Sequence, residues 1–331
     1  MKSIVIVTIL GFSIAGAAHA APSAIVDTAY VQEAMKHGAI IWDARSAEDY
    51  KKGHIPGALN IGDIAKTLRN VNSEEYVAQD QIEKLLGGAG IDPSREIVVY
   101  GAKGSPLAYF GNVTVAYFGG KNAHVYHGGI DDWKSAVQTV STEEAKLPPV
   151  QLHLKVDPSV AISTQDVLKS LKRHNVQIVD VRTPKEYSGE DIRALRGGHI
   201  PGAVNIPFQQ NWADPDAPKK LAKKEVANKD GLALKSTEQL KALYAKLDPN
   251  KETIVYCQSG VRASETATVL HTLGFKKVRV YGWLAYGNTL SAPAADVSFF
   301  NVGALNGKIA AMEKHIEALE KRLSVAKATK Q

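Results

Sequence analysis

The sequence predicts an α/β protein of two tandem domains, each with a mainly parallel sheet flanked by helices, plus a C-terminal helix with a heptad pattern. The chain has 331 residues, a length typical of about two domains. One order of motifs occurs twice, and residues 53–61 match residues 198–206 at eight of nine positions. In both copies β-rich runs alternate with helical runs, which is typical of parallel sheets.

The first copy is expected over residues 22–146. Its first strand ends at Asp43-Ala44-Arg45, and the block at 53–61 follows. The expected strands are 39–42, 97–100 and 123–126, and the expected helices are 28–37, 77–86 and 107–118.

The second copy is expected over residues 159–297, behind a Pro-containing linker at 147–158. Its first strand ends at Asp180-Val181-Arg182, and a later apolar run leads into a loop whose first residue is Cys257. The expected strands are 176–179, 253–256 and 278–281, and the expected helical segments are 164–174, 237–247, 263–273 and 283–286.

Residues 1–20 have the pattern of a secretory signal peptide. Lys2 precedes an apolar run at 4–10, and Ala18-His19-Ala20 forms a small-x-small cleavage site. An uncleaved anchor is the alternative, but the apolar run is short for crossing a bilayer. We therefore expect an exported periplasmic protein that is not attached to the membrane after cleavage.

The composition fits an ordinary globular protein, with 44% apolar residues and a formal net charge of +6. The Lys-rich spots at 219–220 and 223–224 are not interleaved with aromatic residues. This favours solvated surface over a nucleic-acid interface, so no nucleic-acid partner is expected.

Cys257 is the single cysteine of the chain. It cannot form an intrachain disulfide, so it is either a buried inert thiol or a reactive one. A Gly-containing loop and a helical run follow it, and such a strand-to-helix turn points backbone N–H groups into the loop. This position favours a nucleophile.

The polar residues of the repeated blocks have a structural interpretation. His54 and His199 precede Ile-Pro-Gly in both copies, including the copy that lacks a cysteine. We therefore expect them to bond backbone near the turn. The Asp-x-Arg pairs at 43–45 and 180–182 are expected to be buried ion pairs that fix the loop, with substrate binding by Arg182 as the alternative.

With both copies aligned, the chain resembles the tandem-domain rhodaneses, the thiosulfate and 3-mercaptopyruvate sulfurtransferases, and in particular their exported bacterial members. The resemblance covers residues 25–297 and has Cys257-x-x-Gly260-x-Arg262 in the second copy only. It implies a catalytic C-terminal rhodanese domain and an inactive N-terminal rhodanese-like domain with Gly101 in place of the cysteine.

The resemblance implies sulfur transfer in two displacements. Cys257 attacks the outer sulfur of thiosulfate or 3-mercaptopyruvate and carries it as a persulfide. A thiol or cyanide then accepts the sulfur, and a thioredoxin-like protein is one candidate acceptor. Arg262 and the loop amides are expected to stabilise the anionic sulfur. No metal or organic cofactor is expected. The substrate-facing loop residues are Gln258, Ser259, Gly260 and Val261.

The choice of donor depends on cations near the loop. Long family members carry an arginine four positions after the Asp-x-Arg arginine, but this chain has Glu186 there. Arg193 and Arg196 are the candidate replacements, and surface positions for both are the alternative.

The tail at 300–326 has apolar residues spaced alternately three and four apart, an a/d heptad pattern typical of a coiled coil. Lys308, Glu313, His315, Glu320 and Arg322 flank the apolar stripe and can pair across a parallel seam. Self-association through residues 302–323 and packing back on the chain's own domain are the two interpretations.

Three other functions compete with the sulfurtransferase. The first is a persulfide carrier that serves a docked partner without turnover of free donor. The second is a structural scaffold, which would have no reason to keep Cys257 and Arg262 together. The third is a phosphatase or arsenate reductase. Related phosphatases have a longer loop than the six residues from Cys257 to Arg262, which favours sulfur.

Overall fold

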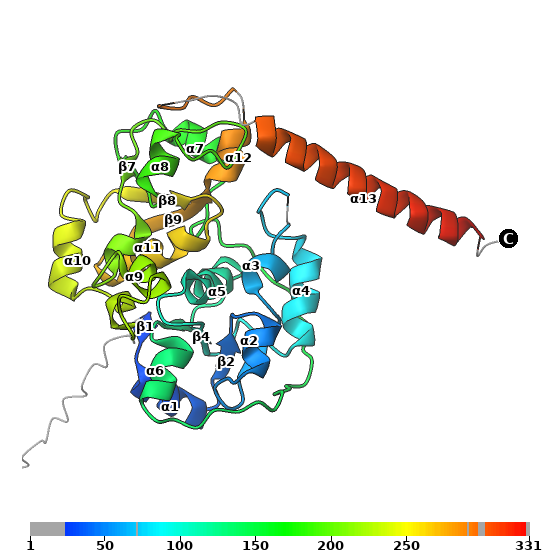
Figure 1. Ribbon diagram of the computed structural model, residues 1–331, viewed down its shortest axis with the longest axis vertical. Helices are drawn as coiled ribbons and strands as arrows, with labels where there is room; N and C mark the ends of the chain where they lie inside the picture. Colours follow the sequence, from blue (N-terminus) through cyan, green and yellow to red (C-terminus); the bar gives the residue numbers. More distant parts are fainter. Residues whose placement is uncertain (1–23, 71, 290, 297–301, 329–331) are drawn as a thin grey trace, which may run out of the picture.

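The computed structural model describes residues 24–70, 72–289, 291–296 and 302–328. The predicted signal peptide at 1–20 lies outside the described residues. Two α/β domains stack along the long axis, and a long helix extends from the second (Figure 1).

The N-terminal domain has a five-stranded sheet in the order β1-β5-β4-β2-β3, and every pairing in it is parallel. Each residue of the central strand β4 is buried, as expected for a parallel sheet covered on both faces. The strands are β1 Ile25–Val26, β2 Ile40–Asp43, β3 Leu59–Asn60, β4 Ile97–Tyr100 and β5 Ala123–Tyr126. The helices are α1 Thr28–Lys36, α2 Ala47–Lys51, α3 Ile64–Thr67, α4 Gln79–Gly88, α5 Pro106–Tyr117 and α6 Gly129–Ser135.

The C-terminal domain repeats this arrangement with a parallel sheet in the order β7-β6-β8-β9. Its strands are β6 Val176–Asp180, β7 Val204–Asn205, β8 Glu252–Cys257 and β9 Lys277–Gly282. Its helices are α7 Thr164–Ser170, α8 Pro184–Ser188, α9 Ala217–Ala222, α10 Thr237–Leu243, α11 Val261–Thr272 and α12 Trp283–Asn288, with short 3-10 turns η1 Phe208–Asn211 and η2 Asp230–Leu232. The predicted two-domain α/β fold is thereby confirmed.

Several predicted boundaries are wrong by a few residues. The helices predicted at 164–174 and 237–247 end earlier, at Ser170 and Leu243. Cys257 is the last residue of β8 rather than the first loop residue, because it still pairs with Gly282 of β9. The nucleophile candidate is therefore held by the sheet itself.

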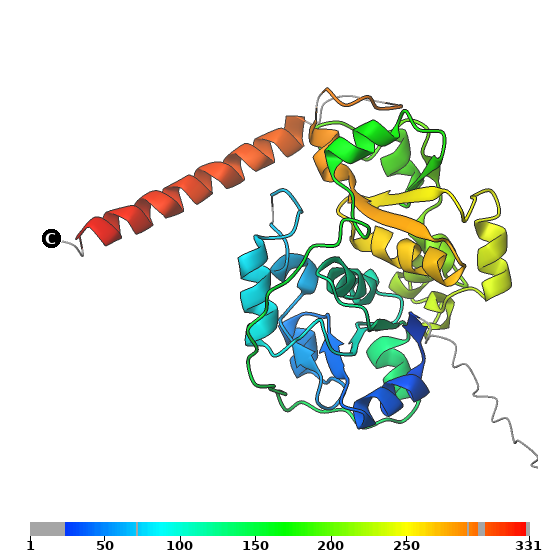
Figure 2. The same ribbon diagram turned by 180° about the vertical axis from the view of Figure 1, so that it is seen from behind.

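The two domains meet along α5 and α11, which lie side by side between the sheets (Figures 1 and 2). Helix α11 is buried from Ala263 to Leu270 without interruption. A helix buried all round belongs to a core, so the helix that follows Cys257 is fixed by both domains. The predicted linker at 147–158 has no helix or strand and runs along α4, where the Val150 N–H donates to the Gly87 carbonyl at 2.9 Å.

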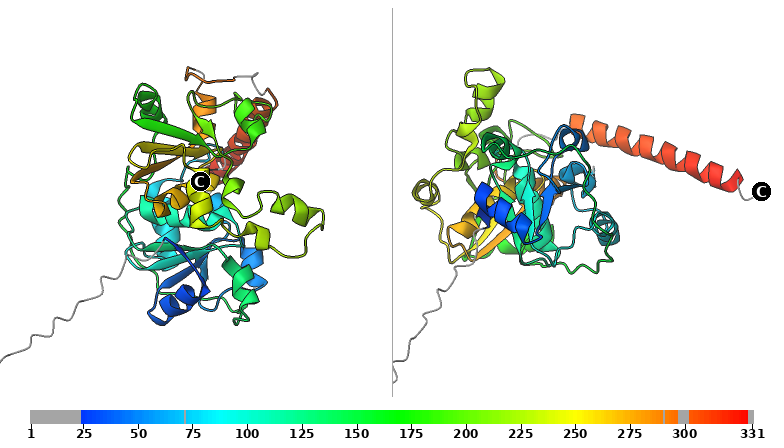
Figure 3. Two further views of the ribbon diagram at one scale, coloured as in Figure 1. Left: turned by 90° about the vertical axis from the view of Figure 1, so that its left-hand side faces the viewer. Right: turned by 90° about the horizontal axis from the view of Figure 1, so that it is seen from below.

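The tail forms helix α13, Val302–Ala328, which projects away from both domains (Figure 3). Its apolar side chains Ile309, Met312, Ile316, Leu319 and Leu323 are between 44% and 56% exposed. The described tail therefore does not pack back on its own domain. Among the described residues, no helix has the length and apolarity needed to span a membrane.

Candidate active site

Cys257 lies at the junction of β8 and α11. Gly260 has φ +90°, a left-handed conformation in which glycine is unstrained, and this turn leads directly into Val261 of α11. The turn brings the Gly260 N–H within 3.1 Å of Cys257 Sγ, to which it donates. Cys257 is fully buried. The predicted arrangement of a thiol facing the amides of a strand-to-helix turn is present.

Arg262 is held beside Cys257 by a two-pronged pair with Glu186. Its Nη1 and Nη2 donate to Glu186 Oε2 and Oε1, each at 2.8 Å. Glu186 is itself fixed, because it closes the capping box of α8 with Thr183. The Glu186 carboxylate therefore binds Arg262, and it does not present its negative charge to the sulfur donor. It forms an ion pair with the loop arginine and fixes the position of its guanidinium, a pairing that the sequence analysis missed.

The pKa values of both groups reflect this pair. Burial would raise the pKa of Glu186, but the pair with Arg262 outweighs burial and lowers it to about 2. Burial would likewise lower the pKa of Arg262, but Glu186 and the Cys257 thiolate together raise it. Both partners are therefore charged across the physiological range.

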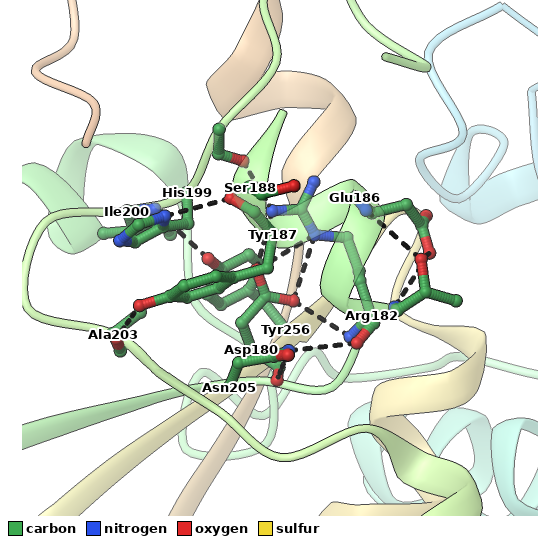
Figure 4. Close-up of polar contacts among 12 residues, drawn as sticks. Asp180, Arg182, Glu186, Tyr187, Ser188, His199, Ile200, Ala203, Asn205 and Tyr256 are labelled. Atoms are coloured by element: carbon green, nitrogen blue, oxygen red, sulfur yellow. Dashed lines mark hydrogen bonds and ion pairs between the residues drawn. The ribbon is translucent and has the colours of Figure 1, made fainter. Parts of the chain in front are cut away.

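Arg182 is buried and forms an ion pair with Asp180, and the same arrangement is present in both domains. Its Nη2 donates to Asp180 at 2.6 Å and to the Gly198 carbonyl at 2.7 Å, and its guanidinium lies 4.4 Å from the Trp283 ring centroid. Figure 4 shows this cluster around Asp180. The N-terminal domain repeats it with Arg45 on its own Asp-x-Arg aspartate. This placement favours the structural interpretation over substrate binding by Arg182.

His199 has the structural position that its motif predicts. The ring stacks on Tyr187 at 3.6 Å between centroids, and Nδ1 lies 3.0 Å from the Tyr187 carbonyl (Figure 4). His54 repeats the stack on Tyr50 at 3.7 Å. Both histidines fix the entry to the Ile-Pro-Gly turn.

The two arginines proposed to replace the donor-binding one have different positions. Arg196 is buried, and its guanidinium donates to the backbone carbonyls of four residues, Tyr286, Gly287, Thr289 and Ala292. Those contacts fix the segment after α12 and leave it no part in the cavity described below. Arg193 is half exposed and its Nη1 lies 3.4 Å from Glu186 Oε1.

A cavity of about 580 Å³ lies between the domains, against the Cys257 loop. Gln258, Ser259 and Gly260 form the C-terminal-domain wall, while Val261 packs on the N-terminal core. From the N-terminal domain, Arg69 lines the same cavity. No sequence signal pointed to Arg69, because it lies in a loop of the other domain and in no repeated motif.

The corresponding place in the N-terminal domain is filled. The Gly101–Gly104 loop is covered by Leu232 of the other domain, whose Cβ would lie 3.0 Å from a Cβ added to Gly104. His127 Nε2 lies 2.8 Å from the Leu232 carbonyl, and this contact fixes Leu232 over the loop. The N-terminal domain thus has Gly101 in place of the thiol, and the other domain covers the Gly104 end of its loop.

Glu265 on α11 is a fully buried carboxyl whose Oε1 accepts from Trp212 Nε1 at 3.0 Å. Its Oε2 has no hydrogen-bond partner in the described part of the chain. Burial therefore raises the pKa of Glu265 to about 8, only partly offset by bonds from Asn211 and Trp212.

We expect Glu265→Gln to make the free energy of unfolding less dependent on pH. The native state binds the proton more tightly than the unfolded state, whose carboxyl has its ordinary pKa of 4.5. Stability should therefore fall as pH rises from 4.5 to about 8, by at most about 5 kcal/mol, and the uncharged glutamine should remove this slope. Urea unfolding at a series of pH values measures it, and parallel pH curves for both proteins would contradict the assignment.

Comparisons with known proteins identify the family of both domains. Residues 27–136 and 163–288 each match the rhodanese-like domain family. A thiosulfate sulfurtransferase of Corynebacterium glutamicum is 33% identical over 258 residues, covering 74% of this chain and 80% of that protein. The sulfur carrier protein TtuD of Thermus thermophilus is 32% identical over 297 residues, covering 84% and 98%.

Solved structures share the fold. The 3-mercaptopyruvate sulfurtransferase SseA of Escherichia coli superposes with a TM-score of 0.64 at 24% identity, covering 78% of this chain and 98% of that one. Wild-type EanB gives 0.69 at 22% identity, covering 82% and 68%. The two matched domains, which span most of the chain, and the thiosulfate sulfurtransferase of 33% identity show that this chain belongs to the rhodanese family of sulfurtransferases.

Proposed function

We propose that the protein transfers the outer sulfur of thiosulfate to a thiophilic acceptor through a persulfide on Cys257, with 3-mercaptopyruvate as a second possible donor. The observation that carries the proposal is the Gly260 N–H at 3.1 Å from Cys257 Sγ, beside an arginine fixed in place by Glu186. This arrangement favours an anionic sulfur at Cys257.

The reaction balances as two displacements at sulfur. The Cys257 thiolate attacks the outer sulfur of thiosulfate, a new S–S bond forms, and the original S–S bond breaks with its electron pair leaving on sulfite. Cyanide or a thiolate then attacks the outer persulfide sulfur, and the pair of the breaking bond returns to Cys257. No electrons are gained or lost overall, and the enzyme is regenerated.

Steady-state kinetics test this proposal. Thiocyanate formation is measured while thiosulfate and cyanide are varied, and 3-mercaptopyruvate replaces thiosulfate in a second series. A ping-pong reaction gives parallel double-reciprocal lines. Intersecting lines would show that donor and acceptor bind together and would exclude a persulfide that forms before the acceptor arrives.

A persulfide carrier is the second candidate, and its support is the similarity to TtuD over 98% of that protein. A carrier would accept one sulfur atom from the donor. It would convert free cyanide to thiocyanate at a negligible rate. It would pass the sulfur to a partner protein instead, and a reduced thioredoxin-like protein is the probe to use. Single-turnover transfer to that probe, without multiple turnovers to cyanide, would favour this function.

We also propose that the protein is exported to the periplasm, on the signal-like pattern of residues 1–20. N-terminal sequencing of the protein from a periplasmic extract should begin at Ala21. A protein that keeps Met1 and stays in the cytoplasmic fraction would contradict export.

We propose further that α13 joins two copies as a parallel coiled coil. The exposed stripe from Ile309 to Leu323 has heptad spacing. In a parallel pair the heptad places Lys308 against Glu313, and His315 against Glu320, of the second copy, whereas an antiparallel pair would oppose like charges. Charge complementarity therefore favours the parallel arrangement.

The tail proposal predicts that Ile316→Asp dissociates the oligomer, because the change places a charge in the apolar seam. The adjacent Glu317→Gln, outside the stripe, serves as the matched control and should leave the mass unchanged. Size exclusion with light scattering at several concentrations measures both. A wild-type mass equal to that of one chain at all concentrations would contradict the proposal.

A further inference from the structure

Arg69 is a nearly buried cation on the N-terminal-domain wall of the interdomain cavity. It is 8% exposed and lines the same cavity as Gln258, Ser259 and Gly260. Its guanidinium carbon lies 5.4 Å from the centroid of the Phe110 ring, which supports the group from one face.

Within the described residues, no acceptor bonds the Arg69 guanidinium and no carboxylate forms an ion pair with it. The other arginines near the site have partners within the chain. Arg182 pairs with Asp180, Arg262 and, at 3.4 Å, Arg193 pair with Glu186, Arg196 donates to backbone carbonyls, and Arg279, which also lines the cavity, pairs with Glu252. A buried cation without a partner is unfavourable, so the position calls for an anion from outside the chain.

Charged and titratable groups around Arg69 affect its pKa without forming an ion pair with it. Burial lowers the pKa of Arg69, while Cys257 and then Tyr76, Glu74 and Glu75 act in the opposite direction. The geometric link between Arg69 and the Cys257 loop is the cavity that Arg69 lines together with Gln258, Ser259 and Gly260. Glu74 keeps a buried carboxylate oxygen without a hydrogen-bond partner among the described residues.

The position of Arg69 is fixed by its backbone. Arg69 forms an antiparallel bridge with Tyr76, and the Val77 N–H donates to the Leu68 carbonyl at 3.0 Å. Tyr76 in turn bonds Thr114 of α5 through its hydroxyl at 2.8 Å. The loop is therefore tied at its base to α5, the helix that packs against α11 beside the Cys257 loop.

We propose that Arg69 binds the anionic end of the sulfur donor, so that the domain without a cysteine supplies the donor-binding cation. The planar guanidinium matches two oxygens of a sulfonate or carboxylate, and this directs the outer sulfur of thiosulfate toward Cys257. The inference rests on the proposed function and assigns the role that Glu186 cannot perform.

The role follows from the charges of the loading step. Both the Cys257 thiolate and thiosulfate are anions, and their approach is unfavourable in a partly buried site. Arg69 offsets this repulsion and stays bonded to the sulfite oxygens while the donor S–S bond breaks. Arg262 does not replace it, because both of its terminal guanidinium nitrogens already donate to Glu186.

Alkylation of Cys257 tests the role independently of sulfur transfer, because the chain has a single cysteine. Iodoacetate and iodoacetamide have the same reactive group but only iodoacetate is an anion. We expect Arg69→Met to lower the iodoacetate-to-iodoacetamide rate ratio about tenfold and Arg69→Lys to restore most of it. The matched control is Lys66→Met, which removes the same charge from a side chain that is 82% exposed.

The rate at which thiosulfate loads sulfur onto Cys257 is measured on the same proteins by rapid-quench mixing and intact mass spectrometry. Arg69→Met should slow loading about 30-fold, while Lys66→Met should not. An unchanged alkylation ratio together with normal loading in Arg69→Met would overturn the inference. If the wild type fails to load at all, the proposed function falls, and the alkylation ratio still decides whether Arg69 binds anions. Thermal unfolding of each variant shows whether it is folded.

Discussion

Cys257→Ser is expected to abolish sulfur transfer, with a loss in turnover of about 10⁴-fold or more. A serine hydroxyl stays protonated at neutral pH and cannot carry a persulfide. The fold should survive, because the hydroxyl is smaller than the thiol and can still accept from the Gly260 N–H that now contacts Sγ at 3.1 Å. Thiocyanate formation from thiosulfate and cyanide measures the effect.

Thermal unfolding is the control for this variant, since Cys257 is buried in the core that also holds Val255 and Ala267. A melting curve close to that of the wild type shows that lost activity reflects lost chemistry. Retention of even a tenth of the wild-type rate in a folded Cys257→Ser protein would remove Cys257 as the nucleophile.

Breaking the Glu186–Arg262 pair is expected to have the largest effect on stability. Glu186→Gln leaves the Arg262 cation in a mostly buried position, next to Arg193, without its countercharge. Arg262→Met leaves the buried Glu186 carboxylate with only the longer, 3.4 Å contact from Arg193. Each change should lower the free energy of unfolding by about 3 kcal/mol, and the double variant should lose less than the sum. Urea unfolding of all four proteins measures the coupling, and strictly additive losses would contradict it.

The same pair gives a pH dependence with a definite sign. The native pKa of Glu186 is about 2, against an ordinary 4.5, so the folded state binds fewer protons in that interval. The stability that the pair contributes is fully present above pH 4.5 and is lost as pH falls toward 2. The stability difference between wild type and Glu186→Gln should therefore narrow over this interval, and a constant difference would contradict the assigned pKa.

The sequence was sufficient to predict features that repeat or that are local. The duplicated Gly-His-Ile-Pro-Gly block predicted both domains, and His199 stacks beside its turn as expected. Cys257, Gly260 and Arg262 lie within six residues, so the loop geometry follows from one strand-to-helix turn. The buried Asp-x-Arg pairs also involve residues only two positions apart.

The contacts that sequence reasoning missed join distant parts of the chain. Glu186 and Arg262 are 76 positions apart, and Arg69 meets the Cys257 loop only because α5 packs on α11. Leu232 covers the Gly104 loop across the same domain interface. Periodicity and motif spacing describe single elements, and they carry no information about which loop of one domain covers the site of the other.

The most direct measurement of the central claim is the intact mass of the wild-type protein after incubation with thiosulfate and removal of small molecules. We predict a gain equal to one sulfur atom, located on the peptide that contains Cys257 and lost on addition of cyanide. An unchanged mass with both thiosulfate and 3-mercaptopyruvate, in a protein whose Cys257 is still reduced, would contradict the sulfurtransferase account.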